Sequence, residues 1–362
     1  MTKAELDSIK ILPLEDSWYR RVKEKLDGIA KPLDGLGKFE HLIAQIGAIE
    51  KTTKISIQKK AVIVMCADNG VVEEQVSQSG KEVTLAVAKA MGVNNSSVGK
   101  MAAVAGVDVI PVDIGIDTDE VIPGVLPRKV AKGTKNFAKE PAMTEEEVLK
   151  AIETGIQLVQ QCHREGYEIL ATGEMGIGNT TTSTAVAAAL LDLEVEQVTG
   201  KGAGLTDEAL KRKCRVIEEA IEKYSLRDAD AFTILKTVGG LDIAGLTGVF
   251  IGAAIEQIPV VIDGVISAVA ALLAETLCKG AVNYMIPSHK SRELAETAIM
   301  KKLHLDPVLD ADMALGEGTG AVMMMSLLDV ALGVYLQGAS FANFEIEQYK
   351  RYDCLLYTSD AA

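Results

Sequence analysis

The sequence contains few aromatic residues, which make up 4% of its 362 positions, whereas apolar residues of all kinds make up 48%. Its core must therefore be packed from Ala, Val, Ile, Leu and Met. Side chains of this kind are typical of parallel β-strands that helices cover on both faces. The composition thus favours an α/β protein with a buried parallel sheet.

The sequence also lacks paired cysteines and metal-ligand spacings. Its five cysteines are widely separated and form no CxxC pair, and its four histidines show no spacing typical of zinc ligands. The N-terminus has no apolar run of the kind that a secretory signal contains. We therefore expect reduced thiols, no metal site and no cofactor, in a cytoplasmic protein.

Positive charge is in deficit. Lys and Arg number 37 against 51 Asp and Glu, which gives a net charge of −14. Such a chain repels the phosphate backbone of nucleic acids and anionic membrane surfaces, so we expect neither as a partner. A small anionic substrate is compatible with this charge, because backbone N–H groups and one or two lysines create a local positive site.

No long apolar run is free of polar or helix-breaking residues. The best candidate for a membrane span, residues 244–277, is interrupted by Glu256, Pro259 and Asp263. This segment is better interpreted as a helix, a strand and a second helix in the core of a globular protein.

Four β-branched apolar runs predict buried strands that deliver small or acidic residues to one edge of a sheet. These runs are residues 61–68, 107–115, 168–173 and 258–264. Helical periodicity predicts two or three helices within residues 1–60, and the spacing from Thr144 to Glu147 predicts a capping box that opens a helix. The alternation predicts a doubly wound, mostly parallel sheet whose ligands bind beyond the carboxyl ends of the strands.

The strongest local signal is the glycine-rich turn Gly-Glu-Met-Gly-Ile-Gly-Asn-Thr at residues 173–180, between a predicted strand and a helix. Backbone N–H groups and the positive end of the helix favour a phosphate there, although a structural glycine turn is the alternative. Asn179 stands where a triphosphate-binding loop has lysine, and Glu174 lies inside the turn, so a monophosphate is the better candidate. The candidate ligands are Glu174, Gly176, Gly178, Asn179 and Thr180.

Four further residues are candidates for substrate binding. Gly202 and Lys213 follow the turn and offer backbone donors and positive charge, although most lysines on charged helices are simply solvated. Asp242 and Asp263 each lie among apolar residues beside glycine. A buried carboxylate needs hydrogen bonds, which come either from backbone at a strand edge or from a ligand.

Glu317 lies between Gly316 and Gly318 and follows Leu315. Flanking glycines allow the backbone to approach a ligand closely and leave the carboxylate free to point into a cavity. Glu317 is therefore a candidate general base, with an exposed turn glutamate as the alternative.

Taken together, seven segments resemble the nicotinate-nucleotide:dimethylbenzimidazole phosphoribosyltransferase family, which builds the lower-ligand nucleotide of cobamides. Each segment alone is a weak signal, but their order and spacing along the chain are specific. The segments are residues 31–40, 67–72, 133–138, 140–144, 173–180, 238–242 and 316–320.

The resemblance implies a Rossmann-like large domain at residues 61–285, a small helical domain built from residues 1–60 and 286–350, and a homodimer. We assign no role to residues 351–362. It further implies that Glu317 is the catalytic base, and that residues 173–180 and Lys213 hold the nucleotide phosphate. We also place Ser79, Leu315 and Gly316 at the substrates.

The expected substrates are nicotinate mononucleotide and a benzimidazole-type base. The nicotinate of the mononucleotide is an N-alkylated pyridinium, so its departure from C1′ neutralises the ring nitrogen and needs neither metal nor acid. One carboxylate base is therefore sufficient. The stretch at residues 77–84 departs from the family's Ala-Tyr-Pro-Gln pattern. The acceptor is therefore open among dimethylbenzimidazole, another benzimidazole, a purine and a phenol. A diphosphate-dependent phosphoribosyltransferase and a non-catalytic nucleotide-binding regulator are the competing functions.

Overall fold

The structure is a computed structural model that describes residues 1–202 and 204–351. Ala203 and residues 352–362, which include Cys354 and nearly all of the segment without an assigned role, lie outside the described residues. The chain divides into two compact units. The larger consists of Met1–Pro13 and Ile57–Ser326, and the smaller consists of Leu14–Ser56 and Leu327–Ala362.

The larger unit alternates strands and helices along the chain. Its strands are β1 (Lys60–Ala67), β2 (Val107–Gly115), β3 (Leu126–Pro127), β4 (Ile169–Met175), β5 (Val260–Ile262) and β6 (Met285–Pro287). Its helices are α1 (Lys3–Asp7), α4 (Glu82–Gly92), α5 (Ser97–Ala105), α6 (Glu145–Arg164), α7 (Asn179–Leu191), α8 (Val195–Val198), α9 (Asp207–Lys223), α10 (Ala231–Val238), α11 (Leu241–Glu256), α12 (Val265–Leu277) and α13 (Leu294–Leu303). Helix α14 (Thr319–Gln337) begins in the larger unit and continues in the smaller one.

The strands form one sheet in the order β3-β2-β1-β4-β5-β6, and every described pair is parallel. Lys60 pairs with Val107 on one side and with Ile169 on the other, so the chain reverses its direction of winding between β1 and β4. This arrangement confirms the predicted doubly wound α/β fold. In such sheets ligands bind beyond the strand ends at the point of reversal.

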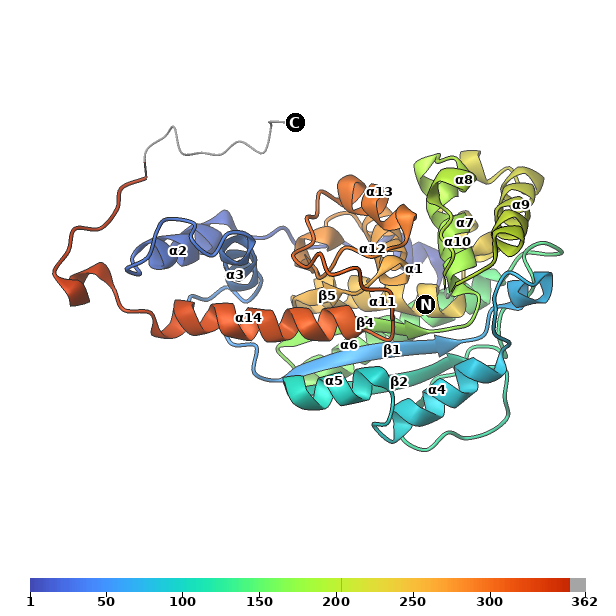
Figure 1. Cartoon of the computed structure of the whole chain (residues 1–362), viewed down its shortest axis with the longest axis horizontal. Helices are drawn as coiled ribbons and strands as arrows, with labels where there is room; N and C mark the ends of the chain where they lie inside the picture. Colours follow the sequence, from blue (N-terminus) through green and yellow to red (C-terminus); the bar gives the residue numbers. More distant parts are fainter. Residues whose placement is uncertain (203, 352–362) are drawn as a thin grey trace. The chain divides into compact units, whose positions relative to one another are not determined.

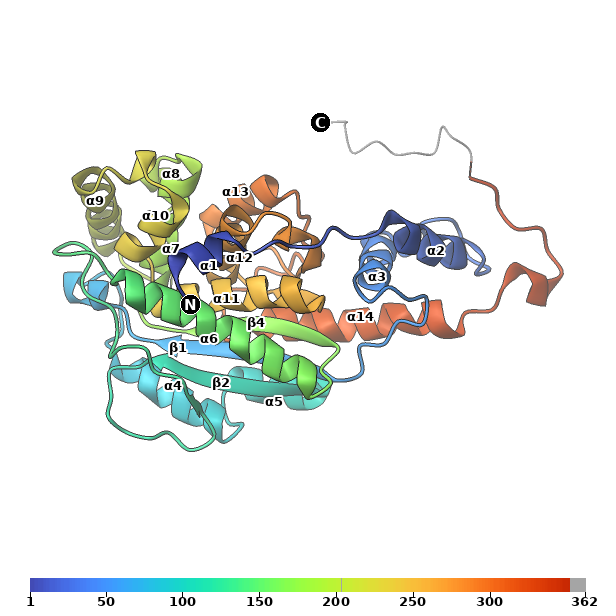
Figure 2. The ribbon, with the colours of Figure 1, turned by 180° about the vertical axis from the view of Figure 1, so that it is seen from behind.

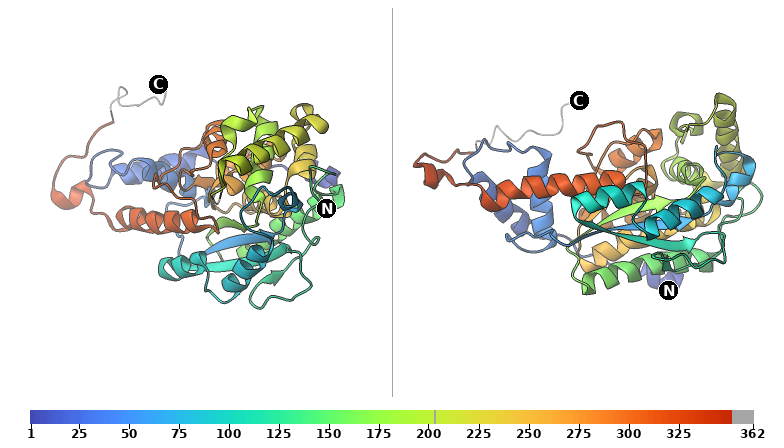
Figure 3. Two further views of the ribbon diagram at one scale, coloured as in Figure 1. Left: turned by 45° about the vertical axis from the view of Figure 1, so that its right-hand side comes forward. Right: turned by 60° about the horizontal axis from the view of Figure 1, so that its bottom comes forward.

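Helices cover both faces of this sheet. Helices α4 and α5 pack on one face, in front of the sheet in Figure 1. Helix α11 packs on the other face and against α6, which lies nearest the viewer in Figure 2. Figure 3 shows the same two helical layers from other directions. The strand β1 is buried along its whole length, as expected for a central strand of small aliphatic residues.

Most of the predicted local structure is confirmed. The four predicted strands correspond to β1, β2, β4 and β5, and Thr144 and Glu147 form the predicted capping box at the start of α6. Residues 244–277 fold as the predicted helix, strand and helix. Strands β3 and β6 were not predicted, because two or three residues are too few to show a period.

The smaller unit contains α2 (Asp16–Asp27), α3 (Lys38–Ile49) and the rest of α14. The hydroxyl of Tyr335 on α14 donates to the carbonyl of Thr53 at 2.8 Å, which links the two chain segments. The predicted domain boundaries need correction, because α1, β6 and α13 belong to the larger unit. Strand β6 pairs with β5, and α13 packs against α12, so neither contributes to the helical unit.

Ion pairs surround three neighbouring carboxylates of the smaller unit, those of Asp27, Asp34 and Glu40. Two lysines compensate the buried Glu40: Lys23 lies 2.9 Å and Lys31 2.5 Å from its oxygens. Arg351 donates to both aspartates. Arg351, the first residue of the segment without an assigned role, therefore makes a structural contact within the smaller unit.

Among the described residues, α14 is the helix long and apolar enough to cross a bilayer by length and composition. More than half of its apolar window, 56%, is buried within the protein, as in a core helix. The sequence interpretation had instead considered residues 244–277, whose helices are shorter than a membrane span.

Candidate active site

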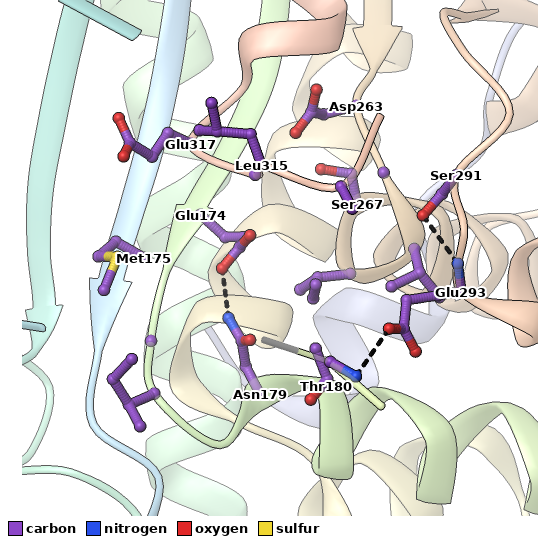
Figure 4. Close-up of a pocket in the computed structure, with 18 of the residues that line it drawn as sticks. Glu174, Met175, Asn179, Thr180, Asp263, Ser267, Ser291, Glu293, Leu315 and Glu317 are labelled. Atoms are coloured by element: carbon purple, nitrogen blue, oxygen red, sulfur yellow. Dashed lines mark hydrogen bonds between the residues drawn. The ribbon is translucent and has the colours of Figure 1, made fainter. Parts of the chain in front are cut away.

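A pocket opens in the larger unit where β4 and β5 end, close to the point at which the sheet reverses (Figure 4). Five segments form its walls: the turn from β4 into α7, the loop between α8 and α9 at Gly202, the junction of β5 with α12, the loop after β6 and the loop before α14. Parallel strands bring the segments after β4, β5 and β6 together because their carboxyl ends meet at one edge.

Asn179 of the glycine turn joins two buried carboxyl groups, that of Glu174 in the same turn and that of Asp242 at the start of α11. Its side-chain nitrogen donates to Glu174 and, at 3.0 Å, to Asp242. Burial raises the pKa of Glu174 to about 8 and that of Asp242 to about 6, while the bonds from Asn179 oppose both shifts. At neutral pH Glu174 is therefore largely uncharged in the unliganded protein. An uncharged carboxyl group at this position is compatible with the phosphate that the sequence predicts at the turn.

Lys213 is fully buried rather than solvated. Its ammonium donates to the hydroxyl of Thr180 at 3.0 Å and to the carbonyl of Gly200 at 3.2 Å. Burial lowers the pKa of Lys213, and the carboxylate of Glu293 opposes this shift. A buried cation thus lies directly behind the first turn of α7.

Glu293 reaches into the same part of the pocket. Its Oε1 accepts a hydrogen bond from the backbone N–H of Gly202 at 3.0 Å, and Figure 4 shows this side chain directed toward the region of Thr180. The backbone donor, the buried Lys213 and the N-terminus of α7 are the groups that an anionic ligand requires. In this structure a protein carboxylate faces them.

Glu317 lies on a turn of unusual backbone conformation. Gly316, Glu317 and Gly318 all have positive φ, at 86°, 61° and 92°. The carboxylate accepts a hydrogen bond at 3.0 Å from the N–H of Val98 in the first turn of α5. In Figure 4 this side chain points away from Glu174 and Asp263, toward the β1 side of the pocket.

Asp263 also lines the pocket, but backbone donors occupy its carboxylate. One oxygen accepts from the N–H of Gly318 and the other from the N–H of Ala321, each at 3.1 Å. Burial raises the pKa of Asp263, and the neighbouring His289 and the backbone N–H groups lower it. The geometry therefore matches the backbone-capping alternative for this aspartate.

The structure brings most of the predicted site residues together. Those lining the pocket are Glu174, Gly176, Asn179, Thr180, Gly202, Asp263, Leu315, Gly316 and Glu317. Gly178 forms the N-cap of α7, while Lys213 and Asp242 lie behind the lining and bond to it. Ser79 is not among the residues that line this pocket, so its role stays a prediction.

Residues after β6 were missed. His289, Ser291 and Glu293 all line the pocket. Their polar sequence would have been a signal if β6 had been predicted, because it follows a strand of the same parallel sheet. The hydrogen bond between Val98 and Glu317 joins residues more than two hundred positions apart, and no local sequence pattern predicts it.

No described group of three potential metal ligands lies in this pocket. The group of that kind found within residues 1–202 and 204–351 is Asp27, Asp34 and Glu40 in the smaller unit. The carboxyl groups of the pocket are each engaged with protein donors. The site thus offers a cradle for an anion and a set of buried or held carboxyl groups.

The fold and the pocket define an α/β protein whose candidate site lies at the carboxyl edge of a parallel sheet. A family model described as phosphoribosyltransferase (DBI_PRT) matches residues 11–346. The chain belongs to this phosphoribosyltransferase family.

Relatives agree over almost the whole chain. A protein of Acetivibrio thermocellus named nicotinate-nucleotide–dimethylbenzimidazole phosphoribosyltransferase is 45% identical over 329 residues, 91% of this chain and 94% of that protein. A protein of the same name from Clostridium acetobutylicum is 43% identical and covers 93% of this chain and 96% of its own length. The crystal structure of CobT from Thermus thermophilus matches with a TM-score of 0.87 and 34% identity, over 92% of this chain and all of that chain.

Proposed function

We propose that this chain transfers ribose 5-phosphate from nicotinate mononucleotide to 5,6-dimethylbenzimidazole or a related base. The products are α-ribazole 5′-phosphate and nicotinate, and the reaction belongs to the assembly of the nucleotide loop of cobamides. The observation that carries the proposal is identity of 43–45% over more than nine tenths of the chain with relatives named as this enzyme. These names argue against a non-catalytic regulator.

The phosphate half of the pocket supports this proposal. The turn before α7, Gly202 and the buried Lys213 supply backbone donors and one positive charge. One monophosphate needs no metal where donors and a lysine are already in place. Glu174 is largely neutral, so it does not repel the ligand and instead offers a hydrogen-bonding group beside it.

Glu317 is the proposed catalytic base. The donor nucleotide carries nicotinate as a pyridinium, so departure from C1′ leaves a neutral ring nitrogen and needs no acid. The acceptor must lose its N–H proton as its other ring nitrogen attacks C1′, and the carboxylate of Glu317 takes that proton. Attack opposite to nicotinate converts a β-linkage into an α-linkage. Holding the base and the ribose in line supplies the rest of the acceleration.

Finer features belong to the same proposal. The protein acts as a homodimer in the cytoplasm, without a cofactor, and the stretch around Ser79 helps to select the base. Dimethylbenzimidazole, another benzimidazole, a purine or a phenol are the acceptors to compare.

The direct test is an assay with nicotinate mononucleotide as donor and a panel of these bases. We expect nicotinate release that depends on the base, survives EDTA and yields an α-linked nucleotide by chromatography and NMR. Survival in EDTA distinguishes this reaction from transfer that uses a diphosphate donor and magnesium. Binding of nucleotide with no release of nicotinate by any base would refute the proposed function.

Glu317→Gln is the matching variant. It keeps the size of the side chain but cannot accept the proton, so we expect turnover to fall about 100-fold or more while nucleotide binding is retained. Turnover can be followed by nicotinate release and binding by calorimetry. Near-normal turnover would remove Glu317 from the mechanism.

A further inference from the structure

The turn that carries Glu317 is held in a conformation that a glutamate does not favour. Left-handed backbone is unfavourable for a residue with a Cβ atom, and Glu317 has a φ of 61°. Strained residues of this kind persist only where their surroundings over-determine them. Some part of the structure must therefore impose this conformation.

Contacts within the turn contribute part of this restraint. The backbone N–H and the hydroxyl of Thr319 both donate to the carbonyl of Gly316, at 3.0 and 2.8 Å. These bonds close the turn upon itself. They do not fix it relative to the sheet, which carries the rest of the pocket.

Asp263 supplies a hydrogen-bonded connection to the sheet. It follows β5 directly, its side chain is 3% exposed, and its two oxygens accept from Gly318 and Ala321, each at 3.1 Å. Those two N–H groups lie immediately after Glu317 and in the first turn of α14. A negative charge at that position is also favoured by the helix dipole.

The surroundings of Asp263 restrict its own movement. The hydroxyl of Ser288 donates to the backbone carbonyl of Asp263 at 3.3 Å. The ring of His289 lies so close to Gly320 that the structure leaves no space for a Cβ atom there. The aspartate is thus clamped between the loop after β6 and the start of α14.

We infer that Asp263 is a positioning residue for Glu317: its carboxylate holds the left-handed turn that presents the base to the acceptor. This role rests on the proposed function of Glu317. The alternative role for Asp263 is direct binding of the substrate, because its carboxylate lines the pocket. A carboxylate suits the task because both of its oxygens accept, whereas an amide would set its NH₂ group against a backbone N–H.

The kinetic test compares Asp263→Asn, Glu317→Gln and the double variant. We expect Asp263→Asn to lower kcat by about 10- to 100-fold with little change in KM for nicotinate mononucleotide. In the Glu317→Gln background the same change should cost little more, because residues that act as a unit are not additive. A raised KM, or losses that multiply in the double variant, would overturn the inference and make Asp263 a substrate ligand.

Asp230→Ala is the control for general destabilisation. Asp230 also accepts two backbone hydrogen bonds at a helix start, that of α10, from Phe232 and Thr233, and alanine removes both. We expect this variant to lose thermal stability while kcat stays unchanged. An equal fall of kcat in both variants would mean that general destabilisation, not the position of Glu317, explains the effect.

Hydrogen exchange tests the same restraint without relying on activity. In the wild-type protein the amides of Gly318 and Ala321 should exchange slowly, and a peptide spanning residues 316–322 should exchange faster in Asp263→Asn but not in Glu317→Gln. Rapid exchange of both amides in the wild type would overturn the inference even if no variant folds. Absence of nicotinate release by the wild type would refute the proposed function instead, so the two failures can be distinguished.

Discussion

Asn179 shows how one residue changes the hydrogen bonding of a glycine turn. Where a triphosphate-binding loop has lysine, this amide bonds two buried carboxyl groups, Glu174 and Asp242. The positive charge is supplied instead by Lys213, from a helix more than thirty residues later in the chain. The sequence shows that this lysine is absent and therefore favours a monophosphate over a triphosphate. The pairing of Asn179 with two carboxyl groups is seen only in the folded structure.

Glu293 is the residue at which a specific substitution should improve binding. Its carboxylate accepts a hydrogen bond from the backbone N–H of Gly202 and lies near the buried Lys213. A nucleotide phosphate is proposed to bind at the same two groups. Like charges repel, so the phosphate must either displace this carboxylate or bind less tightly in its presence. We expect Glu293→Gln to lower KM for nicotinate mononucleotide about fivefold, or about 1 kcal/mol.

Steady-state kinetics with varied nucleotide concentration measure this change. Lys290→Gln is a suitable control, because Lys290 is an exposed charge of the same loop that pairs with Asp310. A higher KM in Glu293→Gln would show that the carboxylate binds the nucleotide, for example through a ribose hydroxyl, rather than competing with it.

The turn from Gly316 to Gly318 is the element on which the site depends. It lies against the central strands so tightly that a Cβ atom added at Gly173 would stand 2.5 Å from the carbonyl oxygen of Glu317. Neither backbone can give way without shifting the other. Gly173 of β4 is therefore needed to let the turn pack against the sheet, in addition to any role that it has beside a phosphate.

Gly173→Ala tests this packing. We expect kcat to fall about 10- to 100-fold, because displacing a catalytic group by about 1 Å costs that much, while the melting temperature falls only modestly. Gly333→Ala is the control, since an added methyl group there meets no atom within 4 Å and alanine favours a helix. Unchanged kcat in Gly173→Ala would show that the turn is not seated by this contact.

At the scale of the whole molecule, buried carboxyl groups set how stability responds to pH. Burial raises the pKa of Glu296 on α13 to about 8, and one of its oxygens has no hydrogen-bond partner among the described residues. An unfolded glutamate ionises near pH 4.3. Between these values the folded state binds more protons than the unfolded state, so stability falls as pH rises.

Glu296→Gln should make that fall shallower. The amide imitates the neutral acid and has no proton to lose, so the variant should gain stability relative to the wild type as pH rises from about 5 to about 8. Thermal unfolding midpoints at pH 5, 6, 7 and 8 measure it. Glu222→Gln, on the exposed side of α9, is the control and should leave the slope unchanged. Parallel curves for Glu296→Gln and the wild type would contradict the prediction.

The sequence by itself determined the class of fold and much of the local structure. Aliphatic runs ending in small or acidic residues, such as residues 61–68, specify buried strands because period and composition are local properties. The capping box at Thr144 and the glycine turn at residues 173–180 are equally local, so they were predicted with the correct neighbours. The order and spacing of seven segments resemble those of a known family, and this resemblance predicted that Glu317 belongs to the site.

Only the tertiary structure decided which groups face one another and in what state. The contact of Val98 with Glu317, the burial of Lys213, and the use of Asp263 to hold a turn all join distant segments through the parallel strands. The raised pKa of Glu174 follows from desolvation by those same segments. Charge state and orientation depend on surroundings that the chain assembles only when folded, whereas strand and turn propensities are present in each short stretch of sequence.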